Sequence, residues 1–143
     1  MPSQTKVSKT VINAYNTAHY RVKVPDDSFV LLIKKKSGPL AALMKDLGVA
    51  SAAFLTAYNP YSQKTNVNVN VRAQKALRND IEKLGMVFYE GTGEDPSGQW
   101  KVEPSFLVLG ISLETAKAIG VKHGQNAVVW VDSDAVPQLM LLR

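Results

Sequence analysis

The chain has 143 residues, of which 45% are hydrophobic and 20% are charged, and it contains no cysteine. This size and balance are typical of one globular domain with a single core, and they exclude a disordered chain and a disulfide-rich scaffold. Lys and Arg outnumber Asp and Glu by 17 to 12, and the resulting net charge of +5 favours weak attraction to anions.

The first residues of the chain lack the apolar stretch of a secretory signal, and no apolar run later approaches the roughly 20 residues that cross a bilayer. We therefore expect a cytoplasmic protein with no membrane partner. Residues 1–18 are expected to form a loosely structured lead-in, because little hydrophobic pattern occurs there. Residues 19–143 are expected to form a single α/β domain.

The first half of this domain predicts a hairpin, a helix and an interior strand. Residues 20–24 alternate apolar and polar side chains, and residues 29–33 form a second apolar run after a turn. Pro39 suits the first turn of a helix that Gly48 would end. Residues 50–57 are small or apolar at nearly every position, which predicts a strand covered on both faces.

The second half predicts two helices and four further strands. The first helix would start near Asn68 or Asn70, either of which is a reasonable N-cap, and end at Gly85. The remaining elements are strands at 86–89 and 106–109, a helix at 113–121, and strands at 128–131 and 136–142. The order ββαβαββαββ predicts an α+β or α/β fold with one mixed sheet and about three helices.

The sequence offers little support for metal or cofactor chemistry. His19 and His123 lie far apart in the sequence, and His123 is expected to be exposed at a helix end. The Gly-Thr-Gly run at residues 91–93 lacks the spacing of a dinucleotide-binding loop. We therefore expect no metal site and no cofactor.

The strongest candidate site is the polar turn at residues 59–62, Asn-Pro-Tyr-Ser, which ends the interior strand. Ligands of α/β sheets bind where loops converge beyond strand ends. The following helix would add free N–H groups and the guanidinium of Arg72, as an anion site requires. The alternative is that Asn-Pro only terminates the strand.

Polar motifs of this kind recur in order along most of the chain, at residues 54–62, at Asn70 and Arg72, at residues 95–96 with Trp100, and at residues 103–111 and 124–130. The combination of Thr-Ala-x-Asn-Pro-x-Ser with Gly-Gln-Asn-Ala is specific. From about Tyr20 to the C-terminus the chain resembles a bacterial domain-of-unknown-function family, number 3293. Its members often carry a second Asn after the arginine, where this chain has Gln74. The resemblance implies no activity.

Three of these motifs flank predicted strands, so they would form one pocket if those strand ends share a side of the sheet. We predict that this pocket binds a small polar or anionic, nucleotide-like ligand, and that hydrolysis there would use Glu103 or Asp95 as the base. Separation of its members by more than about 10 Å would contradict it. The expected ligand-binding residues are Asn59, Ser62, Asn70, Arg72, Trp100, Ser105, Gln125 and Asn126.

Two other functions fit the sequence. The chain could be a non-enzymatic module that binds a protein or nucleic acid through a basic face. That face would be made of Lys34–Lys36, Arg72, Lys75 and Arg78. It could also be a scaffold whose polar motifs only cap turns, in which case Asn59→Ala would cost about 1 kcal/mol of stability.

Overall fold

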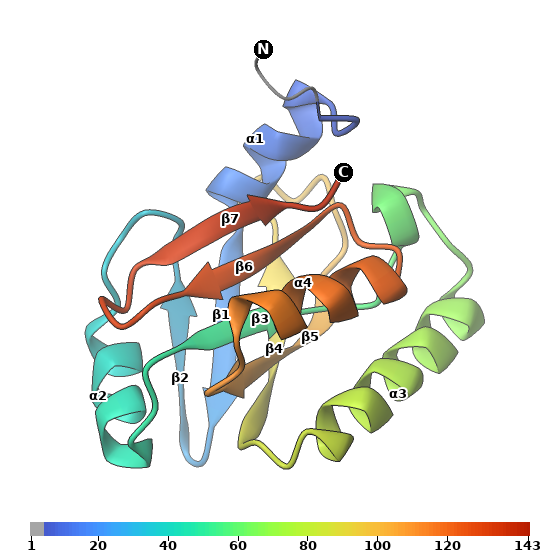
Figure 1. Ribbon diagram of the computed structural model, residues 1–143. Helices are drawn as coiled ribbons and strands as arrows, with labels where there is room; N and C mark the ends of the chain where they lie inside the picture. Colours follow the sequence, from blue (N-terminus) through green and yellow to red (C-terminus); the bar gives the residue numbers. More distant parts are fainter. Residues whose placement is uncertain (1–4) are drawn as a thin grey trace.

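One β-sheet with apolar side chains on both faces organises residues 5–143, the part of the chain that the computed structural model describes. Its strands are connected by helices, by turns and, between β4 and β5, by a longer loop (Figure 1). In chain order the elements are α1 (Lys9–Thr17), β1 (His19–Val24), β2 (Asp27–Leu31), α2 (Gly38–Leu47), β3 (Ala52–Leu55), the 3₁₀ helix η1 (Pro60–Ser62), α3 (Val67–Lys83), β4 (Phe88–Glu94), β5 (Glu103–Leu109), α4 (Leu113–Lys122), β6 (Ala127–Val131) and β7 (Pro137–Leu141).

The strand order in the sheet is β2-β1-β4-β5-β3-β6-β7, and every neighbouring pair is antiparallel. The predicted α+β class is confirmed, and so is the predicted order of elements from the first strand onward. Two details differ. The sheet is not mixed in strand direction, and the described residues contain four α-helices rather than about three.

The two faces of the sheet carry separate cores. Leu40 and Met44 of α2 pack on one face, and α3 and α4 cover the other with residues such as Leu77 and Ile119. Strand β3 lies inside the sheet, between β5 and β6, and is buried at all four positions, Ala52–Leu55. The prediction of an interior strand covered on both faces is therefore confirmed.

The sheet curls because its two edges meet at one end. The amide of Lys34, after β2, donates to the carbonyl of Pro137 in β7 at 2.8 Å, and the amide of Ser37 donates to that of Ala135 at 2.9 Å. Leu31 and Leu139, from the two edge strands, belong to one apolar cluster. The face under α2 is therefore concave, and the candidate site lies on this face.

Helix α1 corrects the expectation of a loose lead-in over residues 1–18; the part of that expectation that concerns residues 1–4 lies outside the described residues. The hydroxyl of Ser8 accepts a hydrogen bond from the amide of Val11 at 3.2 Å and so caps the helix. No residue of α1 is fully buried. Its half-buried residues, among them Val11, Ala14 and Tyr15, lie along one side, and Ala14 and Tyr15 cover the cavity.

The helix caps were predicted in part. Ser37, Pro39 and Gly48 start and end α2, and the positive φ of 67° at Gly48 is the left-handed cap expected there. For α3, the expectation that Asn68 or Asn70 is the cap is wrong. Asn66 caps α3, which places Asn70 one turn inside it, where its side chain is buried.

Candidate functional site

The candidate site forms where the end of β3 meets the starts of β5 and β6. Because β3 is antiparallel to both neighbours, the chain leaving β3 runs beside the residues that enter them. This brings Asn59 next to Glu103, and Gln125 next to Tyr58. The three polar motifs expected to share one side of the sheet therefore do so.

Asn59 is the hub of the first half of the site. Its Nδ2 donates to Glu103 Oε2 at 2.6 Å, and its Oδ1 accepts from the amide of Thr65 at 3.0 Å and from Asn70 Nδ2 at 2.9 Å. The backbone amide of Asn59 donates in return to Asn70 Oδ1 at 2.9 Å. The buried Asn70 therefore fixes Asn59, and Asn59 fixes the carboxylate of Glu103.

The backbone of the turn adopts a conformation that L-residues seldom take. Asn59, Tyr61 and Ser62 have φ values of 46°, 57° and 60°. Each such residue costs of order 1 kcal/mol or more, and strain of this kind gathers at binding and catalytic sites. The turn is held by a 2.7 Å hydrogen bond from the Tyr61 amide to the carbonyl of Gly124, where a Cβ would lie only 3.1 Å from Pro60.

Ser62 connects the turn to the second half of the site. Its hydroxyl forms a short hydrogen bond with the hydroxyl of Tyr15 in α1 and accepts from Asn126 Nδ2 at 3.0 Å. Asn126 Oδ1 accepts from Arg143 at 3.2 Å, and the guanidinium of Arg143 lies 4.0 Å from the ring centre of Tyr61. Asn126 is therefore used to hold the turn and does not line the cavity.

A cavity of about 110 Å³ lies between this network, helix α1 and the concave face of the sheet. Its floor is apolar and includes Tyr20 and Phe54, whose rings meet edge to face at 5.4 Å, together with Val129 and Leu139. Its rim is polar. The rim residues are Thr56, Asn59, Ser62, Glu94, Asp95, Lys101, Glu103, Ser105 and Gln125.

Glu103 is the one carboxylate of the rim without a full set of partners. Within residues 5–143 only Asn59 donates to its side chain, and no Lys, Arg or His forms an ion pair with it. Burial raises the pKa of Glu103, and the hydrogen bond from Asn59 offsets part of that effect. The pKa of Tyr20 is also raised, first by burial, then by Tyr15, and then by the negative charge of Glu103. Glu103 and Tyr20 therefore share one poorly hydrated space.

The other two rim carboxylates are saturated. Asp95 accepts from the hydroxyl and amide of Ser97 and from the amides of Gln99 and Trp100 at 2.7 to 3.0 Å, and these bonds lower its pKa. Glu94 is paired with Arg21 at 2.9 Å, which lowers the pKa of Glu94. Asp95 therefore shapes the loop that carries Trp100 and is poorly placed to act as a base.

The remaining predicted site residues divide into three groups. Trp100, Ser105 and Gln125 line the cavity, although Ser105 already donates to the Glu103 carbonyl at 3.1 Å. Asn70 supports the site from behind. Arg72 does not reach the cavity, because it is exposed on α3 and does not line it.

Several site residues were not predicted from the sequence. Tyr15 and Ala18 of the first helical segment line the cavity, as does Tyr20 of β1, and Thr65 helps to hold Asn59. Ala14, Tyr15 and Ala18 recur at intervals that place them on one side of a helix, with Ser8 as a cap. That pattern was the available signal for α1.

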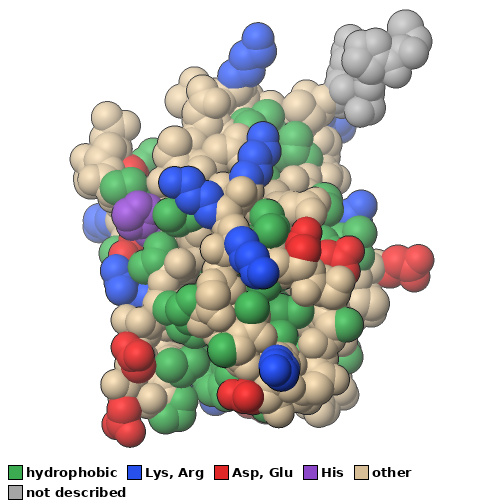
Figure 2. All heavy atoms as spheres, turned by 90° about the vertical axis from the view of Figure 1, so that its left-hand side faces the viewer, with side chains coloured by type: hydrophobic (Ala, Val, Ile, Leu, Met, Phe, Trp, Pro, Cys, Tyr) green, Lys and Arg blue, Asp and Glu red, His purple; other side chains and the backbone are tan. Residues whose placement is uncertain are grey.

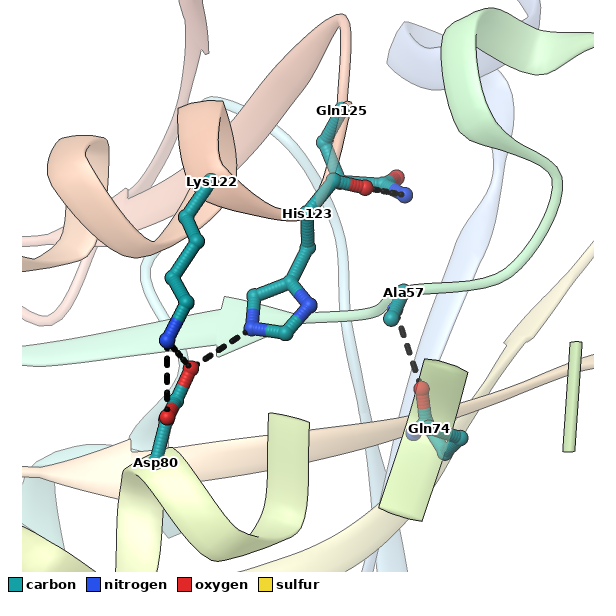
Figure 3. A network of polar contacts seen from close by, with 6 residues as sticks. All are labelled: Ala57, Gln74, Asp80, Lys122, His123 and Gln125. Atoms are coloured by element: carbon teal, nitrogen blue, oxygen red, sulfur yellow. Dashed lines mark hydrogen bonds and ion pairs between the residues drawn. The ribbon is translucent and has the colours of Figure 1, made fainter. Parts of the chain in front are cut away.

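Gln74 stands where members of the family that the sequence resembles often carry asparagine. Figure 3 shows its hydrogen bond to Ala57. Its Oε1 accepts from the amide of Ala57 at 2.9 Å, and its Nε2 donates to the carbonyl of Pro104 at 3.0 Å. The longer side chain thus joins the end of β3 to the start of β5. In this chain the position supports the two strands that carry the site.

The sequence predicted that His123 is exposed, and this is wrong. The side chain links the end of α4 to α3 (Figure 3). Its Nε2 lies 2.8 Å from Asp80 Oδ2, and only 8% of its side chain is exposed. Lys122 also contacts Asp80, at 2.9 Å, and together these partners lower the pKa of Asp80. Figure 3 shows Asp80 rising from α3 toward both residues of α4, which makes this cluster a link between helices.

The basic residues do not converge on one surface. Lys34–Lys36 follow β2, whereas Arg72, Lys75 and Arg78 belong to α3, and Figure 1 shows these two segments on opposite sides of the molecule. Arg78 is also paired with Glu82 at 3.0 Å. On the face shown in Figure 2, the Lys and Arg side chains are separated by hydrophobic and acidic ones.

Within residues 5–143, no group of three or more His, Asp or Glu side chains could hold a metal ion. None of the helices in this part of the chain is long and apolar enough to cross a membrane.

Comparison with known families places the site in context. Residues 55–128, just over half of the chain, match the family described as "Protein of unknown function (DUF3293)". The chain belongs to this family. The DUF3293 match is shorter than the resemblance expected from Tyr20 onward, yet it contains the Asn59 turn, Glu103 and Gln125. No curated protein and no solved structure matches the chain.

Proposed function

We propose that this DUF3293 protein binds a small polar ligand with a planar or apolar portion in the cavity beside Asn59 and Glu103. The apolar part of the ligand would lie against Tyr20 and Phe54, and its polar group would bind Glu103. The observation that carries this proposal is the carboxylate of Glu103, which one hydrogen bond fixes at the wall of a preformed cavity and leaves otherwise unpartnered.

Two free acceptors of the cavity favour a ligand that donates hydrogen bonds. Gln125 uses its Nε2 on the carbonyls of Tyr58 and His123, at 3.2 and 3.3 Å, and no described residue donates to its Oε1. Glu103 Oε1 has no donor in the described chain either. Neither oxygen is fully buried, so both are open to a ligand N–H or O–H.

The same atoms give less support to an anionic group such as a phosphate. The anionic version of the ligand depended on Arg72 and on free amides at the start of α3, and neither lines the cavity. We therefore propose a ligand that has the planar ring and the polar group of a nucleotide-like molecule but carries no negative charge.

Hydrolysis of the bound ligand is a second candidate, favoured by the raised pKa of Glu103. A carboxylate with a raised pKa is a stronger proton acceptor and can activate a water molecule as general base. Asn59 would then act as a positioning residue. Loss of turnover in Glu103→Gln at saturating ligand would support hydrolysis, and unchanged turnover would exclude it.

The binding proposal can be tested by a screen of small ring-bearing molecules against the ¹⁵N-labelled protein. We expect the bound molecules to shift the amide signals of Asn59, Trp100 and Gln125. The shallow groove between α3 and α4, which includes Glu114, supplies the control surface. Hits that shift only the signals of that groove, or no hits from the screen, would contradict the proposal.

A further inference from the structure

The aromatic lining of the cavity and the state of its carboxylates point to a definite ligand charge. We infer that the cavity selects an organic cation, namely an ammonium-type group attached to a planar or apolar body, with the positive charge beside Glu103. This inference rests on the proposed binding function and adds the charge of the ligand to it.

Aromatic side chains supply the first line of evidence. Five of them line the cavity, and they come from α1, β1, β3, the segment after β3 and the loop after β4: Tyr15, Tyr20, Phe54, Tyr58 and Trp100. The faces of aromatic rings attract cations, most strongly where water is excluded. Any ring face that a ligand meets in this cavity attracts an ammonium group and repels an anion.

The carboxylates supply the second line. Three of them line the cavity, but Glu94 is neutralised by Arg21 and Asp95 is saturated by amides and a hydroxyl. Glu103 alone among the three has a free oxygen and no cation. The arrangement therefore leaves Glu103 as the one carboxylate of the cavity that lacks both a cation and a full set of hydrogen bonds, and the bond from Asn59 fixes its position.

Lys101 is the only cation among the lining residues, and it does not supply the missing partner. It is exposed at the rim and forms no ion pair with any residue from 5 to 143. Water and salt screen an exposed ammonium, while the field of Glu103 acts inside the cavity. A ligand cation can therefore occupy the place opposite Glu103.

Three probes of nearly equal size and different charge test this inference: benzylamine, benzyl alcohol and benzoate. Binding is followed through the two indole N–H signals, because Trp100 lines the cavity while Trp130 belongs to the core on the other face of the sheet. We expect benzylamine to shift the Trp100 signal with a Kd of about 1 mM, as suits a ligand of this size. Its affinity should exceed that of benzyl alcohol about tenfold, as for a charge-assisted hydrogen bond.

Glu103→Gln should reduce this preference several-fold, to the part that the aromatic lining supplies. The matched control is Glu114→Gln, an exposed carboxylate on α4, which should leave the tenfold ratio intact. Equal binding of amine and alcohol to the unmodified protein, or a tenfold preference that is unchanged in Glu103→Gln, would overturn the cation inference and leave the binding proposal standing. Failure of all three probes to shift the Trp100 signal would overturn both.

Discussion

Replacement of Asn59 by alanine is the perturbation that the site geometry makes most informative. The side chain accepts two hydrogen bonds and donates one to the carboxylate of Glu103. A neutral hydrogen bond contributes about 1 kcal/mol net and one to a charged group about 2 kcal/mol. Asn59 has a left-handed backbone, with a φ of 46°, and alanine tolerates this conformation less well than asparagine.

We therefore expect Asn59→Ala to lower the free energy of unfolding by about 4 kcal/mol, and the melting temperature by about 10 °C for a domain of this size. Asn59→Gly should cost about 1 kcal/mol less, because glycine accepts the left-handed conformation without strain. Urea denaturation followed by circular dichroism measures both values.

The control for this experiment is Asn79→Ala. Asn79 is exposed on α3, and its side chain makes no hydrogen bond to the described part of the chain. We expect this variant to be as stable as the unmodified protein or slightly more so, since alanine favours helix. A loss of 1 kcal/mol or less in Asn59→Ala, as estimated for a simple turn cap, would refute the role of Asn59 as the hub of the site.

Three further predictions concern the surroundings of the site. Gly91→Ala should lower stability by about 3 kcal/mol or more in urea denaturation, because a Cβ would clash with a backbone oxygen of β1 and lie 2.9 Å from the Phe54 ring, whereas Gly93→Ala, with 3.9 Å to its nearest neighbour, should be nearly neutral. Glu103→Gln should stabilise the protein at neutral pH, and this gain should vanish in acid. Because the pKa of Glu103 is raised in the folded protein, the stability present below the pKa of the unfolded chain is lost as pH rises through the pKa of the folded protein. A stability difference that stays constant across pH would contradict this. Asp80→Asn should cost about 1 kcal/mol at pH 7, and the cost should disappear as pH falls through the lowered pKa of Asp80, as melting temperatures from pH 2 to 7 will show.

Local patterns were sufficient to predict much of the fold. The small apolar side chains of residues 50–57 predicted the buried β3, and Pro39 with Gly48 predicted the limits of α2. Helix α1 was missed because its apolar stripe is short, although Val11, Tyr15 and Ala18 recur at helical spacing. The predicted hairpin of β1 and β2 is confirmed, but the antiparallel direction of the other strand pairs was missed, since the alternation of apolar residues is the same in either direction.

The location of the site could be predicted, but its internal contacts could not. The polar motifs mark strand ends, which is enough to propose that they meet. The bond between Asn59 and Glu103 depends on the β3–β5 register, in which Leu55 pairs with Phe106. Sequence spacing does not fix that register. The sequence also assigned Arg72 to the site. The start of α3 was predicted too late, and because one residue along a helix rotates a side chain by about 100°, the predicted direction of the Arg72 side chain was wrong.

A crystal structure of the protein soaked with benzylamine tests the central claim most directly. We predict the aromatic ring of the ligand against Tyr20 and Phe54, and its nitrogen about 3 Å from Glu103 Oε1, with the hydrogen bond from Asn59 to Glu103 intact. Density for the ligand at another surface, with the cavity beside Asn59 filled by protein side chains, would contradict the account.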